Sequence, residues 1–225
     1  MDEIMTQTLA HKIGFWSSLF FAILGLVLIA ANIGIGFTDQ WQAWEGMDSY
    51  ADWFSSVRVN YFIVAFIASF LMVILFVGIM AALYSLAPAE KRILGVLGSS
   101  FTIVCVTFTS VNYYIQLSVV PNSIQSGQVD ELTRFVYHSP NSFVFAIDIL
   151  GFFFLGLATL CVAPLLEGAL RWLFIAFGIE NIVGLLAHAF DKQLILLFYN
   201  AAMTLTIVTA SILLVLYFRN GKGKV

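Results

Sequence analysis

The sequence predicts an all-α, polytopic membrane protein: a bundle of six transmembrane helices with both termini in the cytoplasm. Of the 225 residues, 61% are hydrophobic and 10% are charged, whereas a soluble domain has about 45–50% apolar and about 25% charged residues. The mean hydropathy is +0.96. Six separate stretches reach the roughly 20 apolar residues that a helix needs to cross the hydrocarbon core. We therefore expect a chain that is solvated mainly by lipid.

The six predicted spans are residues 13–35, 59–86, 93–117, 143–163, 172–190 and 194–218. None of them alternates between polar and apolar residues as a membrane β-strand does. The first span is too long for a signal peptide, and its flank carries acids as well as Lys12, so we expect it to be retained. The second span is longer than the bilayer requires and ends at Pro88, which precedes a charged turn. We expect one domain over residues 1–225.

The orientation follows from the basic residues near the ends of the spans, because cytoplasmic loops are enriched in Lys and Arg. Seven lie on the side of the termini, namely Lys12, Lys91, Arg92, Arg171, Arg219, Lys222 and Lys224. Three lie on the opposite side, namely Arg58, Arg134 and Lys192. This asymmetry and the even number of spans place both termini in the cytoplasm of a multi-pass protein of the cell membrane.

Two loops on the predicted outer side are long. Residues 36–56 contain Trp41, Trp44 and Trp53 among four acids. Indole rings favour the headgroup region, so we expect an interfacial cap; an aromatic ligand cage or a partner-docking surface is the alternative. Residues 118–142 are rich in Ser, Asn, Gln and Gly, which is typical of an exposed lid.

The third span carries a polar stripe. Its members are spaced by three and four residues and therefore share one helix face: Thr102, Cys105, Thr109, Asn112 and Gln116. Hydroxyl groups and small side chains let membrane helices approach closely. We interpret the stripe mainly as a packing face.

Ionisable residues inside spans are costly and are functional candidates by default. Asp148 and Glu180 have no opposite charge one turn away, and Glu180 lies nearest mid-bilayer. Each needs a partner or a proton. Two interpretations stay open: a structural hydrogen-bond centre, or a site for a proton, a cation or a ligand. The candidate ligand- or proton-binding residues are Glu180, Asp148, Asn181, His188, Asn112, Gln116, Asn200 and Arg58.

The sequence lacks the motifs of several kinds of catalytic and cofactor site, so we predict no catalytic residue and no metal site. Among the histidines only His188 lies in a span, which disfavours a bis-His haem. The two cysteines form no Cys-x-x-Cys motif, and no glycine-rich phosphate loop with a lysine is present. The net charge of -3 gives no basic surface for nucleic acid.

The predicted function is the binding or translocation of a small solute or ion through a polar pocket open to the outer side. We expect no enzymatic activity, although a membrane-embedded enzyme acting on a lipid or quinone is one alternative. An accessory subunit of a membrane complex is the other. The expected partners are the lipid bilayer, a small solute or ion, and another membrane protein or a second copy. The sequence identifies no cofactor.

Overall fold

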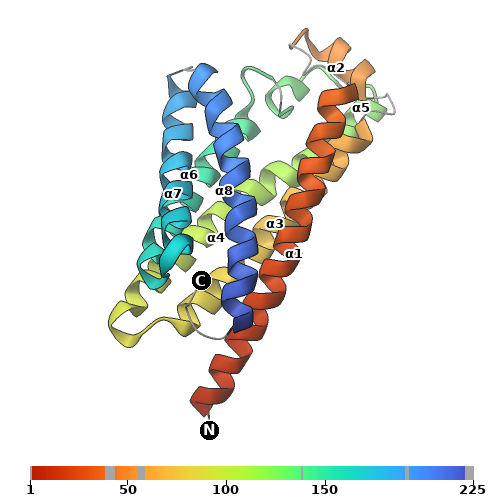
Figure 1. The fold of residues 1–225 in the computed structure, drawn as a ribbon. Coiled ribbons are helices and arrows are strands. Elements are labelled where there is room, and N and C mark those ends of the chain that lie inside the picture. The colour runs from red at the N-terminus through yellow and green to blue at the C-terminus, as the bar shows by residue number, and fades with distance from the viewer. Residues whose placement is uncertain (1, 39–43, 55–58, 138, 191–192, 221–225) are drawn as a thin grey trace.

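The structure, a computed structural model, describes residues 2–38, 44–54, 59–137, 139–190 and 193–220. Within these ranges the side chains of residues 2–6, 36–38, 59 and 193–201 are not described. The described chain is helical and contains no strand (Figure 1). Its α-helices are α1 (Asp2–Thr38), α2 (Met47–Phe54), α3 (Val59–Leu86), α4 (Arg92–Tyr114), α5 (Val120–Gln125), α6 (Phe143–Val162), α7 (Gly168–Ala189) and α8 (Gln193–Asn220).

The predicted all-α fold class with six spans is confirmed. Six segments are long and apolar enough to cross a membrane: Gln7–Ile35, Asn60–Leu86, Ala89–Gln125, Phe143–Leu165, Gly168–Ala189 and Ala202–Asn220. The protein is therefore a multi-pass membrane-spanning helical bundle.

The third span is longer than predicted. A π-helical turn at Ile115–Val119 joins α4 to α5, so the helical path continues to Gln125 instead of ending at residue 117. Pro121 lies in the first turn of α5, directly after the π-helical turn. Gly127 follows with a φ of +70°, a conformation that glycine adopts without strain. The first part of the predicted lid at residues 118–142 is therefore helix.

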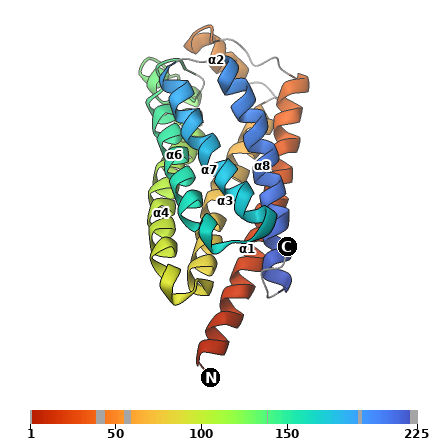
Figure 2. The same ribbon diagram turned by 60° about the vertical axis from the view of Figure 1, so that its left-hand side comes forward.

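The six spanning segments form a closed ring. α1 packs against α3, α3 against α4, α4 against α6, α6 against α7, α7 against α8, and α8 returns to α1. Figures 1 and 2 show these helices running along a common axis, with successive helices antiparallel. We call the end of the ring that carries α2 the α2 end, and the end where α1 begins and α8 finishes the terminal end.

Close backbone contact between α6 and α7 depends on two glycines. A Cβ added at Gly156 would lie 2.8 Å from the carbonyl oxygen of Gly178, and one added at Gly178 would lie 2.9 Å from that of Gly156. Small residues of this kind let membrane helices approach closely. The same crossing buries Asn181, whose Cβ lies 3.0 Å from the Cβ position of Gly156.

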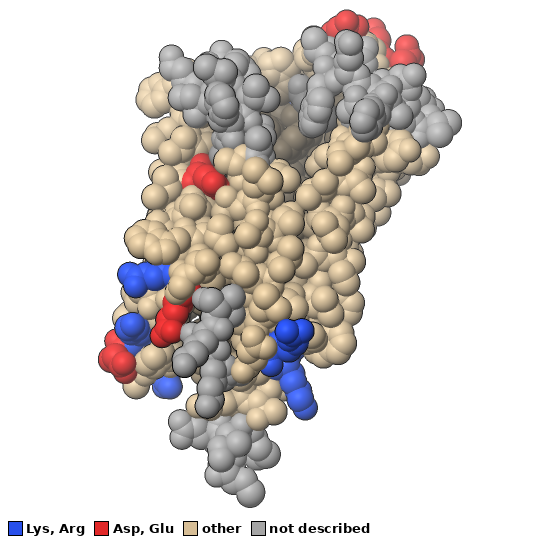
Figure 3. Space-filling view, in the orientation of Figure 1, with Lys and Arg blue, Asp and Glu red and all other residues tan. Residues whose placement is uncertain are grey.

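Charge is distributed unevenly along the axis. Of the six described basic residues, five belong to elements at the terminal end, namely Lys12, Lys91, Arg92, Arg171 and Arg219. The sixth, Arg134, lies in the loop between α5 and α6 at the α2 end, where Glu45, Asp48 and Asp52 flank or lie in α2. Figure 3 shows the basic side chains toward the terminal end, and acidic side chains both beside them and at the tip of the α2 end. This agrees with the basic-residue asymmetry used to predict cytoplasmic termini. The orientation in a membrane stays a prediction.

Helix α2 folds onto the α2 end instead of extending into solvent. Tyr50 and Phe54 are buried, and Trp44 and Trp53 pack against the same apolar cluster. The ring of Trp53 meets that of Phe62 on α3 edge-on at 5.5 Å. The described part of the loop thus packs as a cap, as predicted; Trp41 lies outside the described residues.

Candidate functional site

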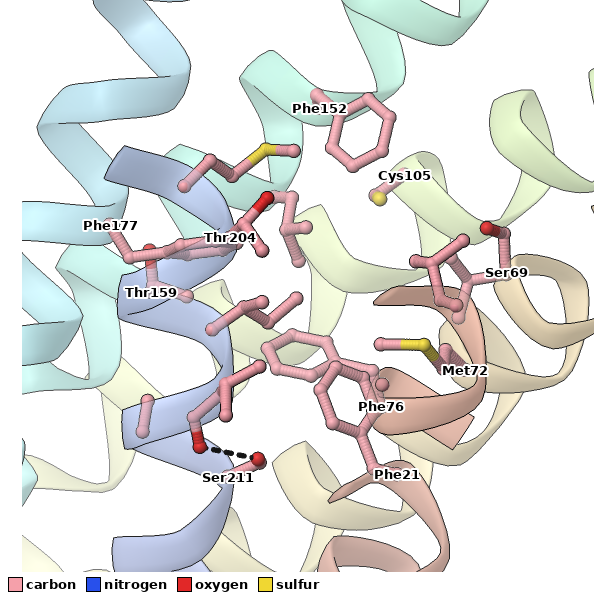
Figure 4. A pocket seen from close by; sticks show the side chains of 18 of the residues that line it. Phe21, Ser69, Met72, Phe76, Cys105, Phe152, Thr159, Phe177, Thr204 and Ser211 are labelled. Atoms are coloured by element: carbon pink, nitrogen blue, oxygen red, sulfur yellow. Dashed lines mark hydrogen bonds between the residues drawn. The ribbon is translucent and has the colours of Figure 1, made fainter. Parts of the chain in front are cut away.

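A cavity of about 120 Å³ lies inside the ring and is lined by side chains from all six long helices. Most of the lining is apolar, with Phe21 of α1, Met72 of α3, Leu155 of α6, Phe177 of α7 and Ile207 of α8 among the contributors. Figure 4 shows these elements surrounding the space. A mainly apolar cavity with a few polar groups is the usual form of a small-molecule site.

The polar lining groups are concentrated toward the α2 end. Asn32, Ser69, Tyr113 and Thr204 lie on the outer or middle turns of their helices, counted from the α2 end. Deeper in the cavity, the Thr159 hydroxyl donates to Gly156 O at 2.9 Å. The Ser211 hydroxyl donates to Val208 O at 2.8 Å (Figure 4). Because these two hydroxyls are bonded to their own helices, the deep part of the cavity is largely apolar in character.

Asp148 lies in a buried polar cluster behind the cavity wall. Its side chain is 1% exposed, and Tyr137 Oη donates a hydrogen bond to its Oδ2 at 3.4 Å. The amide of Asn112 approaches the same carboxyl. Neither polar atom of Asn112 meets the geometry of a hydrogen bond, and Asp148 Oδ1 is also unpartnered. Cys105 and Tyr113, on the same helix as Asn112, line the cavity.

Gln116 secures the loop that precedes α6. Its Nε2 donates to the carbonyl oxygen of Phe135, and its Oε1 accepts from the backbone N–H of Tyr137 at 3.3 Å. Two backbone groups of an irregular segment are thereby satisfied by one buried side chain. The bonds hold Tyr137 over Asp148, so Gln116 positions this cluster.

The polar stripe of the third span is a packing face, as interpreted. All five members are at most 1% exposed. The hydroxyls of Thr102 and Thr109 donate to carbonyls one turn back on their own helix, and Thr109 packs where a Cβ on Gly151 of α6 would lie. Within this face, Asn112 and Gln116 face the Asp148 cluster and the loop.

Glu180 and Asn181 join α7 to its neighbours and do not line the cavity. The hydroxyl of Thr206 on α8 donates to Glu180 Oε1 at 2.9 Å, while Glu180 Oε2 is buried without a hydrogen-bond partner. Asn181 Nδ2 donates to Phe177 O on its own helix at 2.7 Å. Both residues lie at helix–helix contacts.

His188 contacts Phe145, which in turn contacts Tyr137 of the Asp148 cluster. Its ring meets that of Phe145 edge-on at 5.0 Å, and Phe145 meets Tyr137 at 4.9 Å. The predicted site residues Arg58 and Asn200 cannot be placed, because Arg58 and the side chain of Asn200 lie outside the described residues.

The structure therefore separates two features that the sequence analysis combined. Asp148, Asn112 and Gln116 come together at one place, and His188 is linked to them through Phe145. None of the six described candidates lines the cavity. Sequence reasoning missed the cavity because most of its lining residues are apolar and resemble lipid-facing residues. One lining residue, Cys105, belongs to the polar stripe of the third span, which the sequence analysis had interpreted as a packing face.

Among the described residues, no group of three or more His, Cys, Asp or Glu side chains is arranged to hold a metal ion. The chain matches no known protein-family model, and no curated protein or solved structure matches it either.

Proposed function

We propose that this membrane protein binds a small, mainly apolar molecule in the cavity inside its six-helix ring. The observation that carries the proposal is the convergence of all six spanning helices on one apolar space with polar groups toward one end. Under the predicted orientation, that end faces the outside of the cell membrane.

The mainly apolar lining favours an apolar ligand over the small solute or ion that the sequence analysis predicted. A hydrated ion or strongly polar solute needs polar groups along its path to replace water. The candidate residues that would supply them, Asp148 and Glu180, are engaged outside the cavity by Tyr137 and Thr206. An apolar ligand gains from transfer into this lining without such replacement.

Binding is favoured over the enzyme alternative by the arrangement of the polar lining. A membrane-embedded enzyme would need a nucleophile beside a base, or a general acid, in contact with the bound molecule. The hydroxyls of Thr159 and Ser211 are bonded to backbone carbonyls, and the Asp148 carboxyl lies behind the wall. These contacts suit a ligand that is held without reaction.

The test uses a small apolar photoreactive probe, trifluoromethyl-phenyldiazirine, on the full-length protein in lipid nanodiscs. After irradiation, labelled residues are mapped by peptide mass spectrometry. We expect labels on Met72 and Leu155, which are 4% and 6% exposed and which the probe reaches only through the cavity.

The matched variants are neighbours on α1. Gly25 lines the cavity, and a Cβ there would lie 3.8 Å from Met72 Cε, so Gly25→Leu fills the space without a backbone clash. Leu26 is 59% exposed, so Leu26→Phe adds volume outside the ring, on the lipid-facing surface. Gly25→Leu should abolish the buried labels and Leu26→Phe should retain them. Unlabelled Met72 and Leu155 in the native protein would refute the proposal.

A further inference from the structure

We propose that the ligand is one acyl chain of a bilayer phospholipid, which enters the cavity sideways between α1 and α8 near the α2 end. This inference rests on the proposed function and specifies its ligand and its route.

The length of the cavity matches an acyl chain from one leaflet of the bilayer. Its lining extends along α1 from Phe21 to Asn32 and along α8 from Met203 to Leu214. Eleven residues of helix correspond to about 16 Å. One leaflet contributes about half of the roughly 30 Å hydrocarbon core. An acyl chain aligned with the bundle axis therefore matches the cavity in length and in chemistry.

An aromatic layer covers the α2 end over α3, α4 and α6. Phe66 of α3 meets Tyr113 of α4 at 5.6 Å and Tyr137 of the loop at 5.5 Å. Tyr137 meets Phe145 of α6 at 4.9 Å, and Gln116 fixes the backbone around Tyr137. Direct entry from water along the axis is therefore blocked on this side of the ring.

On the opposite side of the ring, the cavity reaches the surface of α1 at Asn32, next to α8. These helices meet toward the terminal end, where Phe218 packs against His11 and occupies the space beside Gly14. Figure 1 shows them diverging toward the α2 end. Asn32 is both exposed and part of the cavity lining, so it lies where the cavity meets the surface. Thr204 of α8 also lines the cavity, and we call the region between Asn32 and Thr204 the mouth.

The polarity of the mouth fits the ester region of a phospholipid. Among the described residues of the two helices that line the cavity, Asn32 and Thr204 place their amide and hydroxyl groups nearest the α2 end. Deeper in the cavity, Phe21 and Phe76 pack at 6.0 Å, and Phe174 and Leu214 line the same region. The acyl chain would therefore enter a cavity that is closed at its inner end. Such a cavity suits the binding of a lipid and not its passage across the ring.

The experiment uses full-length protein in nanodiscs of phosphatidylcholine, of which a small fraction carries a diazirine at the end of one acyl chain. Irradiation should cross-link the chain end to Phe21, Phe174 or Leu214, which are 6%, 3% and 3% exposed. Lipid outside the ring cannot reach these side chains. Cross-links to Ile212, which is 52% exposed, report ordinary lipid contact in every sample.

Two variants test the route. The double variant Asn32→Trp/Thr204→Trp fills the mouth and should lower the buried cross-links at least tenfold while those at Ile212 persist. Ile33→Trp adds the same side chain at a neighbouring position that is 52% exposed, and should have no effect. Unchanged buried cross-links in the double variant would overturn the lateral route.

The outcomes separate this inference from the proposed function. If the small diazirine probe labels Met72 and Leu155 but the lipid chain never reaches the buried residues of native protein, the acyl-chain inference falls and the proposed function stands. If neither reagent labels buried cavity residues, both fall.

Discussion

The hydroxyl of Thr206 on α8 donates a 2.9 Å hydrogen bond to Oε1 of Glu180 on α7. This bond engages Glu180, the acid that the sequence analysis placed nearest mid-bilayer, in a helix–helix contact outside the cavity lining. Hydrogen bonds between membrane helices contribute about 0.6 kcal/mol on average and up to about 1.7 kcal/mol. The geometry therefore supports the structural interpretation of Glu180.

We predict that Glu180→Gln has little effect and that Thr206→Val is destabilising. Gln retains an oxygen that accepts from Thr206, whereas Val removes the donor and leaves both carboxyl oxygens unpartnered. Thr206→Val should lower the free energy of unfolding in mixed detergent micelles by about 1 kcal/mol. Thr209→Val is the control, since that hydroxyl bonds only within α8, to Leu205 O. Loss of cavity labelling in Glu180→Gln would instead support the ligand- or proton-site interpretation.

Tyr137 and Asp148 should be energetically coupled. Tyr137→Phe removes the 3.4 Å hydrogen bond that Asp148 Oδ2 accepts, and Asp148 Oδ1 has no hydrogen-bond partner among the described residues. Leaving a buried polar group unsatisfied costs about 1–3 kcal/mol. The same substitution in an Asp148→Ala background should cost less, which a double-mutant cycle measures. Tyr114→Phe, at a side chain that is 64% exposed, should be neutral, and equal costs in both backgrounds would contradict the coupling.

The α2 cap should weaken at alkaline pH through Tyr50. Burial raises the pKa of the Tyr50 phenol above its ordinary value of about 10. The folded cap thus favours the neutral phenol, so its stability is complete below about pH 10 and declines as the pH rises further. Fluorescence of Trp44 and Trp53, which contact Tyr50, should report the release of α2.

Tyr50→Phe should remove this part of the alkaline transition. It should also leave stability at pH 7 unchanged or higher, because the buried Tyr50 hydroxyl has no hydrogen-bond partner to lose. Tyr61→Phe, at a residue that is 43% exposed, is the control. An unaltered alkaline transition in Tyr50→Phe would show that another group controls it.

The predicted topology is testable by cysteine labelling in a Cys105→Ala/Cys161→Ala background. Asp48→Cys in α2 and Lys91→Cys between α3 and α4 both replace exposed residues at opposite ends of the ring. A membrane-impermeant maleimide should label position 48 in intact cells and position 91 only after the cells are permeabilised. The reverse pattern would invert the orientation and place the mouth of the cavity in the inner leaflet.

The sequence by itself determined the fold class, because a span of about 20 apolar residues is a local property that any stretch of chain displays. It also determined the packing face of the third span, since residues three and four apart share a helix face whatever the neighbours are. The extension of that span through Pro121 was not evident, because the π-helical turn before it depends on local backbone geometry. The cap formed by α2 was predicted in outline from its tryptophans.

Only the tertiary structure decided which polar residues meet and where the cavity lies. Asn112 and Asp148 are 36 residues apart in sequence and come together because α4 packs against α6. Glu180 finds Thr206 because α7 packs against α8. In a membrane protein the lipid-facing and cavity-facing side chains are both apolar, so composition cannot distinguish them. Ring closure between α1 and α8 places Phe21 and Leu214 inside while Leu26 and Ile212 face the lipid.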